Sequence, residues 1–175
     1  MQSAAALSPL VFRRLEHGER SPVLELFRAL SERSRYLRFL GPKPVLPERD
    51  LERLVDVGCC GREAVAAFTG EEGRAVGLAR FVRDAADRSV AEIAFAVGDE
   101  WQGRGLGRLL VRELAELAAA QGITRFSARV HPSNAPALAL LRGLGHIERS
   151  GFVDGLIELE VEVSPRAGTF ADRSV

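Results

Sequence analysis

The chain has 175 residues, of which 46% are hydrophobic and 27% are charged, so it suits one soluble globular domain and excludes a disordered class. Basic and acidic residues number 24 each, and a zero formal net charge lacks the basic surplus that nucleic-acid or membrane binding favours. No apolar run could span a bilayer, and residues 1–10 lack the pattern of a signal peptide. We therefore expect a cytoplasmic protein with Cys59 and Cys60 as reduced thiols.

The first third of the chain is predicted to be one strand followed by helices. Residues 11–15 form the strand. Ser21 is predicted to cap the next helix, because it precedes a first-turn proline and an apolar stripe of helical period. Two further helical stretches cover residues 31–40, which end before Gly-Pro, and residues 47–55.

The remaining pattern indicates an antiparallel meander and then alternating helix and strand. The predicted elements are strands 64–69, 74–83 and 90–97, helix 105–121, strand 124–130, helix 134–144, and a closing hairpin of strands 147–153 and 156–163. The fold class is therefore α/β (α+β), with a mixed, mostly antiparallel sheet of about six to seven strands flanked by helices. We expect a single domain over residues 1–163 and a flexible tail over 164–175, which lacks periodicity.

A glycine-rich turn lies between strand 90–97 and the helix that follows it. It reads Gln102-Gly103-Arg104-Gly105-Leu106-Gly107. Its glycines allow successive backbone N–H groups to point into one concavity, and the helix N-terminus adds about half a positive charge, which suits a diphosphate. Arg104 and Arg108 would add charge-assisted contacts. An ordinary glycine-rich loop that caps a helix has the same appearance.

Two nucleotide-binding alternatives fail at particular positions. A Rossmann turn would have its third glycine where this chain has Arg108, and a carboxylate after the next strand, where Val130 and His131 stand instead. A phosphate-binding loop of the Walker type is excluded because no Gly-Lys-Ser or Gly-Lys-Thr follows the turn.

Two motifs at a fixed spacing give a more specific reading. Gln102-x-x-Gly105-x-Gly107 after a strand, and Asn134-x-x-Ala137-x-x-Leu140 followed by Leu144-Gly145, resemble the two cofactor motifs of the GCN5-related N-acetyltransferase (GNAT) superfamily. The run from Ser34 to Phe39, together with Ala91 to Phe95, resembles the GNAT domain of bacterial protein lysine acetyltransferases of the Pat type. The resemblance covers about residues 10 to 163.

The resemblance implies acetyl-CoA as cosubstrate and a sheet that is splayed at strand 90–97. The backbone N–H groups of Phe95 to Val97 would bind the pantetheine amides and polarise the thioester carbonyl, and the turn would bind the pyrophosphate. Asn134 would also contact pantetheine, although a role as helix N-cap explains an asparagine at this position equally well. Arg142 would reach a CoA phosphate. The residues so implied are Phe95, Ala96, Val97, Gln102, Gly103, Arg104, Gly105, Leu106, Gly107, Arg108, Asn134 and Arg142.

Glu92 is the candidate general base. It shares a strand face with two alanines, Ala94 and Ala96, and the matching glutamate of the Pat-type enzymes takes the proton of the incoming amine. A solvated strand glutamate is the alternative. In many GNAT enzymes a tyrosine at the position of Leu141 acts as the general acid that protonates the leaving thiolate. This chain therefore lacks that general acid. Tyr36, the single tyrosine, is assigned to helix packing or the acceptor pocket.

The predicted function is acetyl transfer to a primary amine, such as a protein lysine, without a metal. A small amine is the second option, and an acidic surface made by Glu48, Glu52 and Asp56 would favour it, although their spacing also fits a solvated helix face. A non-catalytic acyl-CoA-binding regulatory module is the third. The sequence leaves open whether the protein is a homodimer.

Overall fold

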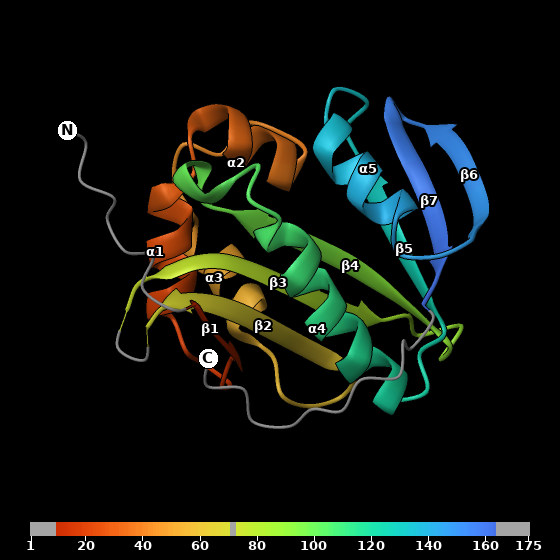
Figure 1. Ribbon diagram of the computed structural model, residues 1–175, viewed down its shortest axis with the longest axis horizontal. Coiled ribbons are helices and arrows are strands. Elements are labelled where there is room, and N and C mark those ends of the chain that lie inside the picture. The colour runs from red at the N-terminus through yellow and green to blue at the C-terminus, as the bar shows by residue number, and fades with distance from the viewer. Residues whose placement is uncertain (1–9, 71–72, 164–175) are drawn as a thin grey trace.

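The computed structural model describes residues 10–70 and 73–163 and arranges them around one seven-stranded sheet (Figure 1). The strand order is β1-β2-β3-β4-β5-β7-β6. The elements are β1 (Leu10–Arg14), α1 (Ser21–Ala29), α2 (Glu32–Phe39), α3 (Glu48–Val55), β2 (Arg62–Thr69), β3 (Ala75–Arg83), β4 (Val90–Val97), α4 (Leu106–Ala120), β5 (Arg125–Val130), α5 (Ala135–Arg142), β6 (Ile147–Val153) and β7 (Leu156–Glu162). This architecture confirms the predicted fold class. Residues 71–72 of the predicted turn and the predicted tail, 164–175, lie outside the described residues.

All neighbouring strands pair antiparallel except β4 and β5, which run parallel. Antiparallel neighbours need only tight turns, whereas the parallel pair needs a crossover, and α4 provides it. The β4–β5 register begins at Val90↔Arg125 and ends at Glu92↔Ser127, although both strands continue. The sheet is therefore splayed at β4, as the resemblance implied.

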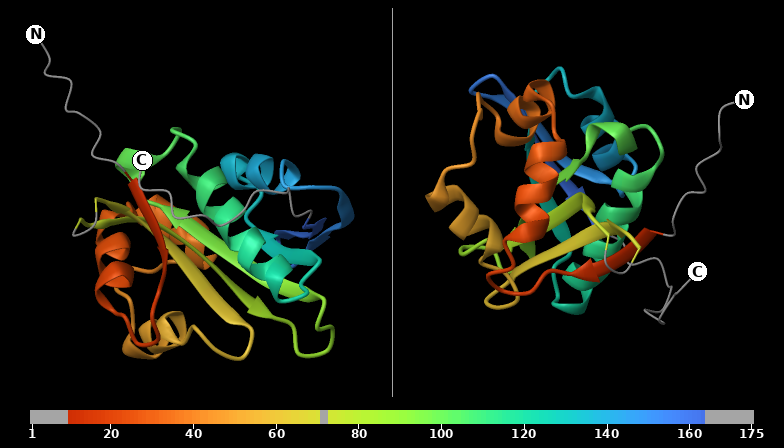
Figure 2. Two further views of the ribbon diagram at one scale, coloured as in Figure 1. Left: turned by 60° about the horizontal axis from the view of Figure 1, so that its bottom comes forward. Right: turned by 90° about the vertical axis from the view of Figure 1, so that its left-hand side faces the viewer.

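Helices cover both faces of the sheet. Figure 2 shows α4 and α5 on one face and α1 and α3 on the other. The core has two parts accordingly. Leu110, Leu114 and Phe126 belong to the buried cluster under α4, while Leu26 and Leu51 belong to the cluster that α1 and α3 share with β2 and β3. The helices of both faces bury their apolar stripes, and this burial is the main favourable term in folding.

Side chains cap α2 and α5 but not α1. Ser31 caps α2 by accepting a hydrogen bond from Ser34 N at 3.2 Å. The prediction that Ser21 caps α1 is wrong. The preceding residue, Arg20, already has helical dihedrals, so Ser21 lies inside the first turn, and no side chain caps the helix. Cys59 and Cys60 are exposed free thiols, and no helix of the described residues is long and apolar enough to cross a membrane.

A substitution at Phe126 tests how much the packing of the larger core cluster contributes to stability. It is fully buried, and its ring centroid lies 6.3 Å from that of Phe81. Phe126→Ala should lower the free energy of unfolding by about 3–5 kcal/mol, because it removes buried apolar surface and leaves a cavity. Phe152, which is 69% exposed on the edge strand β6, provides the matched control, and its alanine variant should change stability by less than about 0.5 kcal/mol. Urea unfolding curves measure both, and equal losses would contradict this account.

Candidate active site

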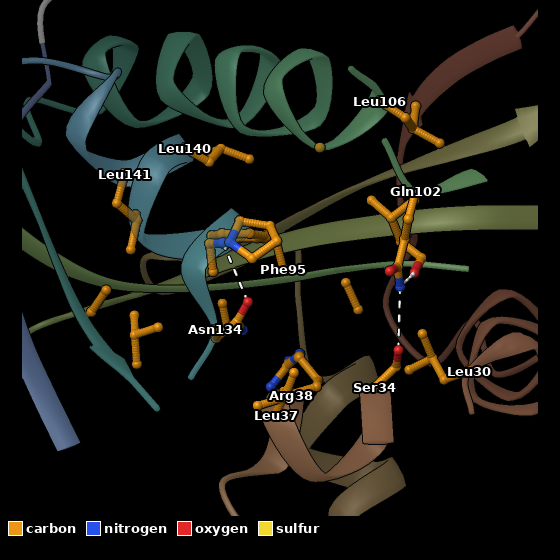
Figure 3. Close-up of a pocket in the computed structure, with 18 of the residues that line it drawn as sticks. Leu30, Ser34, Leu37, Arg38, Phe95, Gln102, Leu106, Asn134, Leu140 and Leu141 are labelled. Atoms are coloured by element: carbon orange, nitrogen blue, oxygen red, sulfur yellow. Dashed lines mark hydrogen bonds between the residues drawn. The ribbon is translucent and has the colours of Figure 1, made fainter. Parts of the chain in front are cut away.

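A cavity of about 850 Å³ occupies the gap between β4 and β5. Its walls come from α2, β4, the turn before α4, the end of β5 and the start of α5 (Figure 3). The parting of two strands thus brings together elements that are far apart in the sequence. Eleven of the thirteen predicted site residues line it: Glu92, Phe95, Ala96, Val97, Gln102, Gly103, Gly105, Leu106, Gly107, Arg108 and Asn134.

The other two predicted residues do not line the cavity. The Arg104 guanidinium lies 5.5 Å from the ring centroid of Trp101 and is exposed on the outer side of the turn. Arg142 is exposed in the last turn of α5. The cavity wall therefore does not include these two arginines, and a contact with an extended ligand outside the cavity stays a prediction.

The backbone of β4 offers hydrogen-bonding groups to the cavity at alternate residues. Hydrogen bonds of 2.9 Å from Asp84 N to Val90 O and from Gly98 N to Val76 O mark the paired positions of the β3–β4 ladder. Because these positions alternate in an antiparallel ladder, even-numbered residues of β4 pair with β3. Phe95 and Val97 therefore direct their N–H groups toward the gap. The prediction that the Ala96 N–H faces a ligand is wrong, since this residue pairs with Leu78.

The glycine-rich turn brings the N-terminus of α4 to the cavity. Gly103 and Gly105 have φ of +72° and +82°, a conformation that other residues adopt only with strain. Gly105 is the N-cap, so the first N–H groups of the helix have no intrahelical acceptor. A Cβ on Gly107 would lie 3.1 Å from Leu140 Cδ1, which shows how closely the turn approaches α5. The turn thus presents unpaired donors and a positive helix end to the cavity.

Gln102 connects the turn to both walls of the cavity. Its Nε2 donates to Val97 O at 3.0 Å, to Ser34 Oγ at 3.2 Å and to Asp99 Oδ1 at 3.4 Å. Asp99 in turn accepts from Ser31 N at 3.2 Å. Burial disfavours the Asp99 carboxylate, but hydrogen bonds from Ser31 and Ser34 outweigh it and lower the pKa of Asp99. Sequence reasoning missed this network, because no local pattern connects α2 to a turn more than sixty residues away.

Asn134 combines the two roles that the sequence left open. Its Oδ1 accepts from Ala137 N at 3.3 Å, so the residue caps α5. The residue also lines the cavity, and Figure 3 shows its side chain beside the cap hydrogen bond. Because the cap uses the oxygen, the amide nitrogen remains for a ligand.

Glu92 occupies the point at which β4 and β5 part. It shares a face of the sheet with Ala94 and Ala96, as the alternation predicts. Its side chain is 58% exposed, and its Oε1 lies 3.6 Å from Arg129 Nη2. A carboxylate in this position is open to water and faces the cavity from the side of the sheet that α2 covers.

The position of the missing tyrosine is filled by a fully buried Leu141. Tyr36 lies elsewhere, with its ring in an edge contact with His131, 5.7 Å between centroids, and this contact joins α2 to the loop after β5. His131 Nδ1 accepts from Ser133 N at 3.1 Å and lies 2.8 Å from Ser133 Oγ. Since the backbone N–H can only donate, the neutral imidazole carries its proton on Nε2.

Arg38 is a cavity residue that sequence reasoning did not single out as a site. It projects from α2 toward the side of the cavity that holds Asn134 (Figure 3). Burial, and then the charge of Arg80, lower the pKa of Arg38 to about 10, while Glu92 acts in the opposite direction. Arg38 therefore remains a cation at neutral pH. Within the described ranges no cluster of His, Cys, Asp or Glu side chains could hold a metal ion.

Comparisons with known proteins agree with this geometry. The model of the Acetyltransferase (GNAT) family matches residues 27–146, more than half of the chain. The chain therefore belongs to the Acetyltransferase (GNAT) family.

Similar proteins include two bacterial acetyltransferases. The chain is 35% identical over 115 residues to Acetyltransferase Pat of Mycolicibacterium smegmatis, a match that covers 66% of this chain and 34% of that protein. It is 26% identical over 140 residues to Acetyltransferase PA5475 of Pseudomonas aeruginosa, which covers 79% of this chain and 75% of that protein. The chain therefore spans about a third of the M. smegmatis relative.

Solved structures show the same fold. The GNAT domain of S. lividans PAT superposes with a TM-score of 0.78 at 27% identity and covers 93% of this chain and 100% of that domain. A cAMP-binding acyltransferase from Mycobacterium smegmatis gives a TM-score of 0.62 at 30% identity and covers 89% of this chain and 44% of that one.

The cap at Asn134 gives a stability prediction. Asn134→Ala should lower the free energy of unfolding by about 1 kcal/mol, because Ala137 N loses its acceptor. Asn134→Asp keeps an acceptor oxygen and should be close to wild type in stability. Urea unfolding distinguishes the two, and a loss of the same size in both variants would show that the cap is not the cause.

Proposed function

We propose that the protein transfers an acetyl group from acetyl-CoA to a primary amine, such as a lysine side chain of a protein. The observation that carries this proposal is the free edge of β4. Beyond Glu92 the described part of β5 leaves β4 unpaired, and the N–H groups of Phe95 and Val97 face the cavity. A pantetheine arm is a chain with amides that can complete such an edge by strand-like hydrogen bonds.

Successive parts of acetyl-CoA would bind at successive positions along the cavity. The donors of the turn, from Gly103 to Arg108, would hold the pyrophosphate at the positive end of α4. The Asn134 amide nitrogen would donate to the pantetheine arm. The Phe95 N–H, whose position on β4 is fixed by the β3 ladder, would polarise the thioester carbonyl.

Proton transfer is assigned to Glu92. An ammonium cannot attack a thioester until it loses a proton, and Glu92 is the cavity carboxylate on the α2 side that has no backbone partner. Its exposure suits transfer through a water molecule as well as direct transfer. No acid replaces the tyrosine at Leu141, and a thiol pKa of about 8.5 makes the thiolate an adequate leaving group near neutral pH.

The structure gives little support to a small polycationic acceptor. Glu48 and Asp56, which an acidic acceptor surface would use, pair with Arg20 and Arg62, and neither carboxylate lines the cavity. Glu52 lies on the same helix, α3, and is not a cavity residue either. The resemblance to Pat-type protein lysine acetyltransferases supports a protein acceptor, and the GNAT domain of S. lividans PAT superposes on this chain with a TM-score of 0.78.

Glu92→Gln tests the proposed base. This substitution should lower kcat by about 10²–10³-fold at neutral pH, because the amine loses its proton acceptor, while the Kd of acetyl-CoA stays within about twofold. CoA release with pooled protein and small-amine acceptors measures the first quantity, and calorimetry measures the second. Glu158→Gln, an exposed glutamate of β7 outside the cavity, is the matched control. Unchanged turnover in Glu92→Gln would remove Glu92 from the mechanism.

Binding of acetyl-CoA can be tested apart from turnover. Asn134→Asp keeps the helix cap but replaces the amide donor by a carboxylate, so the Kd of acetyl-CoA should rise about tenfold with little loss of stability. Gly151→Ala, at an exposed position with open space around its Cβ, serves as the control. Binding of acetyl-CoA by wild type without turnover on any acceptor would identify a regulatory module instead of an enzyme.

A further inference from the structure

Three arginines lie on the same side of the sheet as Glu92. Arg129 follows two residues after the β5 partner of Glu92 and lies 3.6 Å from it. Arg80 stands opposite Ala94 in the β3–β4 register and so shares the face of Glu92. Arg38 reaches the same region from α2, where it borders a small hollow beside Leu78 and Ala96. Arg38 and Arg129 line the cavity with Glu92, whereas Arg80 lies outside its lining and is also influenced by Asp56 and Arg62.

Two of these arginines lack an ion-pair partner. In residues 10–70 and 73–163, no carboxylate lies within 4.0 Å of Arg38 or Arg80. The Arg80 Nε is buried without a hydrogen-bond partner. By contrast, Arg125, another partly buried arginine, contacts Asp87, Glu148 and Glu160. A partly buried guanidinium without an anion is unfavourable, and because Arg38 lines the cavity, a ligand bound there can supply the anion.

The excess of positive charge restricts the acceptor. An acceptor that carries only an ammonium would have Glu92 as its partner and would leave the Arg38 guanidinium without an anion. An acceptor that carries its own carboxylate would meet a matching cation, and the planar guanidinium of Arg38 can bind a carboxylate with two parallel hydrogen bonds. The charged groups of this part of the cavity therefore favour an amine that also carries a carboxylate.

We propose that the acceptor is a primary amine with a carboxylate a few bonds from the reacting nitrogen, and that Arg38 binds this carboxylate while Glu92 faces the amine. The inference rests on the proposed acetyl transfer and adds the chemical class of the acceptor. In the step itself, the amine nitrogen forms a bond to the acetyl carbonyl carbon, the carbon–sulfur bond breaks, the thiolate leaves, and the amine proton passes to Glu92. The carboxylate of the acceptor takes no part in bond making.

The carboxylate has two sources that share this chemistry. It can be the carboxyl group of a free amino acid, or the side chain of an acidic residue beside a lysine in a peptide. Pairs of acceptors that differ only in this carboxylate distinguish the two sources. β-Alanine, 4-aminobutyrate and 6-aminohexanoate are compared with their primary amides, and a lysine peptide with an adjacent Asp is compared with the same peptide carrying Asn.

The test measures kcat/KM for each pair in wild type, Arg38→Gln, Arg38→Lys and Arg28→Gln. Wild type should prefer the carboxylate in at least one pair by roughly 10- to 100-fold, the range of a charge-assisted hydrogen bond. Arg38→Gln should reduce this preference to less than about twofold, mainly through KM, and Arg38→Lys should retain part of it. Arg28, exposed on α1, is the matched control and should retain all of it.

The outcomes separate this inference from the proposed function. Equal rates for every carboxylate and its neutral partner in wild type would overturn the inference while acetyl transfer stands, and this comparison needs no variant to fold. A large increase in the Kd of acetyl-CoA in Arg38→Gln would also overturn it, because Arg38 would then serve the cosubstrate. Acetyl-CoA binding without turnover on any probe, neutral amides included, would instead refute the proposed function.

Discussion

The parting of β4 from β5 is the constraint on which the rest of the structure depends. Three register pairs join the strands, and after Glu92 and Ser127 they separate. A buried strand edge is normally costly because its N–H and C=O groups need partners. Here the edge borders a cavity, so the groups of Phe95 and Val97 are available to a ligand. The other functional features are arranged along this opening: the turn at one end, Glu92 at the point of divergence, and α2 over the mouth.

The two faces of the sheet give the two halves of the opening different chemistry. Odd-numbered residues of β4 pack against α4, so this half is apolar around Phe95 and Val97 and ends in the positive N-terminus of the helix. Even-numbered residues face α2, and this half carries Glu92 and its arginines. The period of two in a single strand thus separates the cofactor side from the acceptor side.

Much of the fold could be predicted from the sequence because its signals are local. The apolar stripe of α4 and the glycine after it gave that helix within one or two residues, and the alternation of β4 placed Glu92 on the correct face. The direction of the Ala96 N–H was wrong because it depends on pairing with β3, which a single strand does not encode. Arg38 was not predicted as a site residue, since its importance comes from desolvation and from Arg80, both of which are tertiary.

The hydrogen bonds of Gln102 have a consequence for how the two ends of the cavity respond to ligands. A single amide nitrogen joins the turn before α4 to Val97 and to Ser34 of α2. A ligand that displaces this amide from Ser34 removes a restraint on the helix that carries Arg38. Any free energy that such a displacement contributes at one end appears with equal size at the other, because linkage between two bound ligands is reciprocal. A ligand that displaces this amide would thus couple occupancy of the turn to the position of α2.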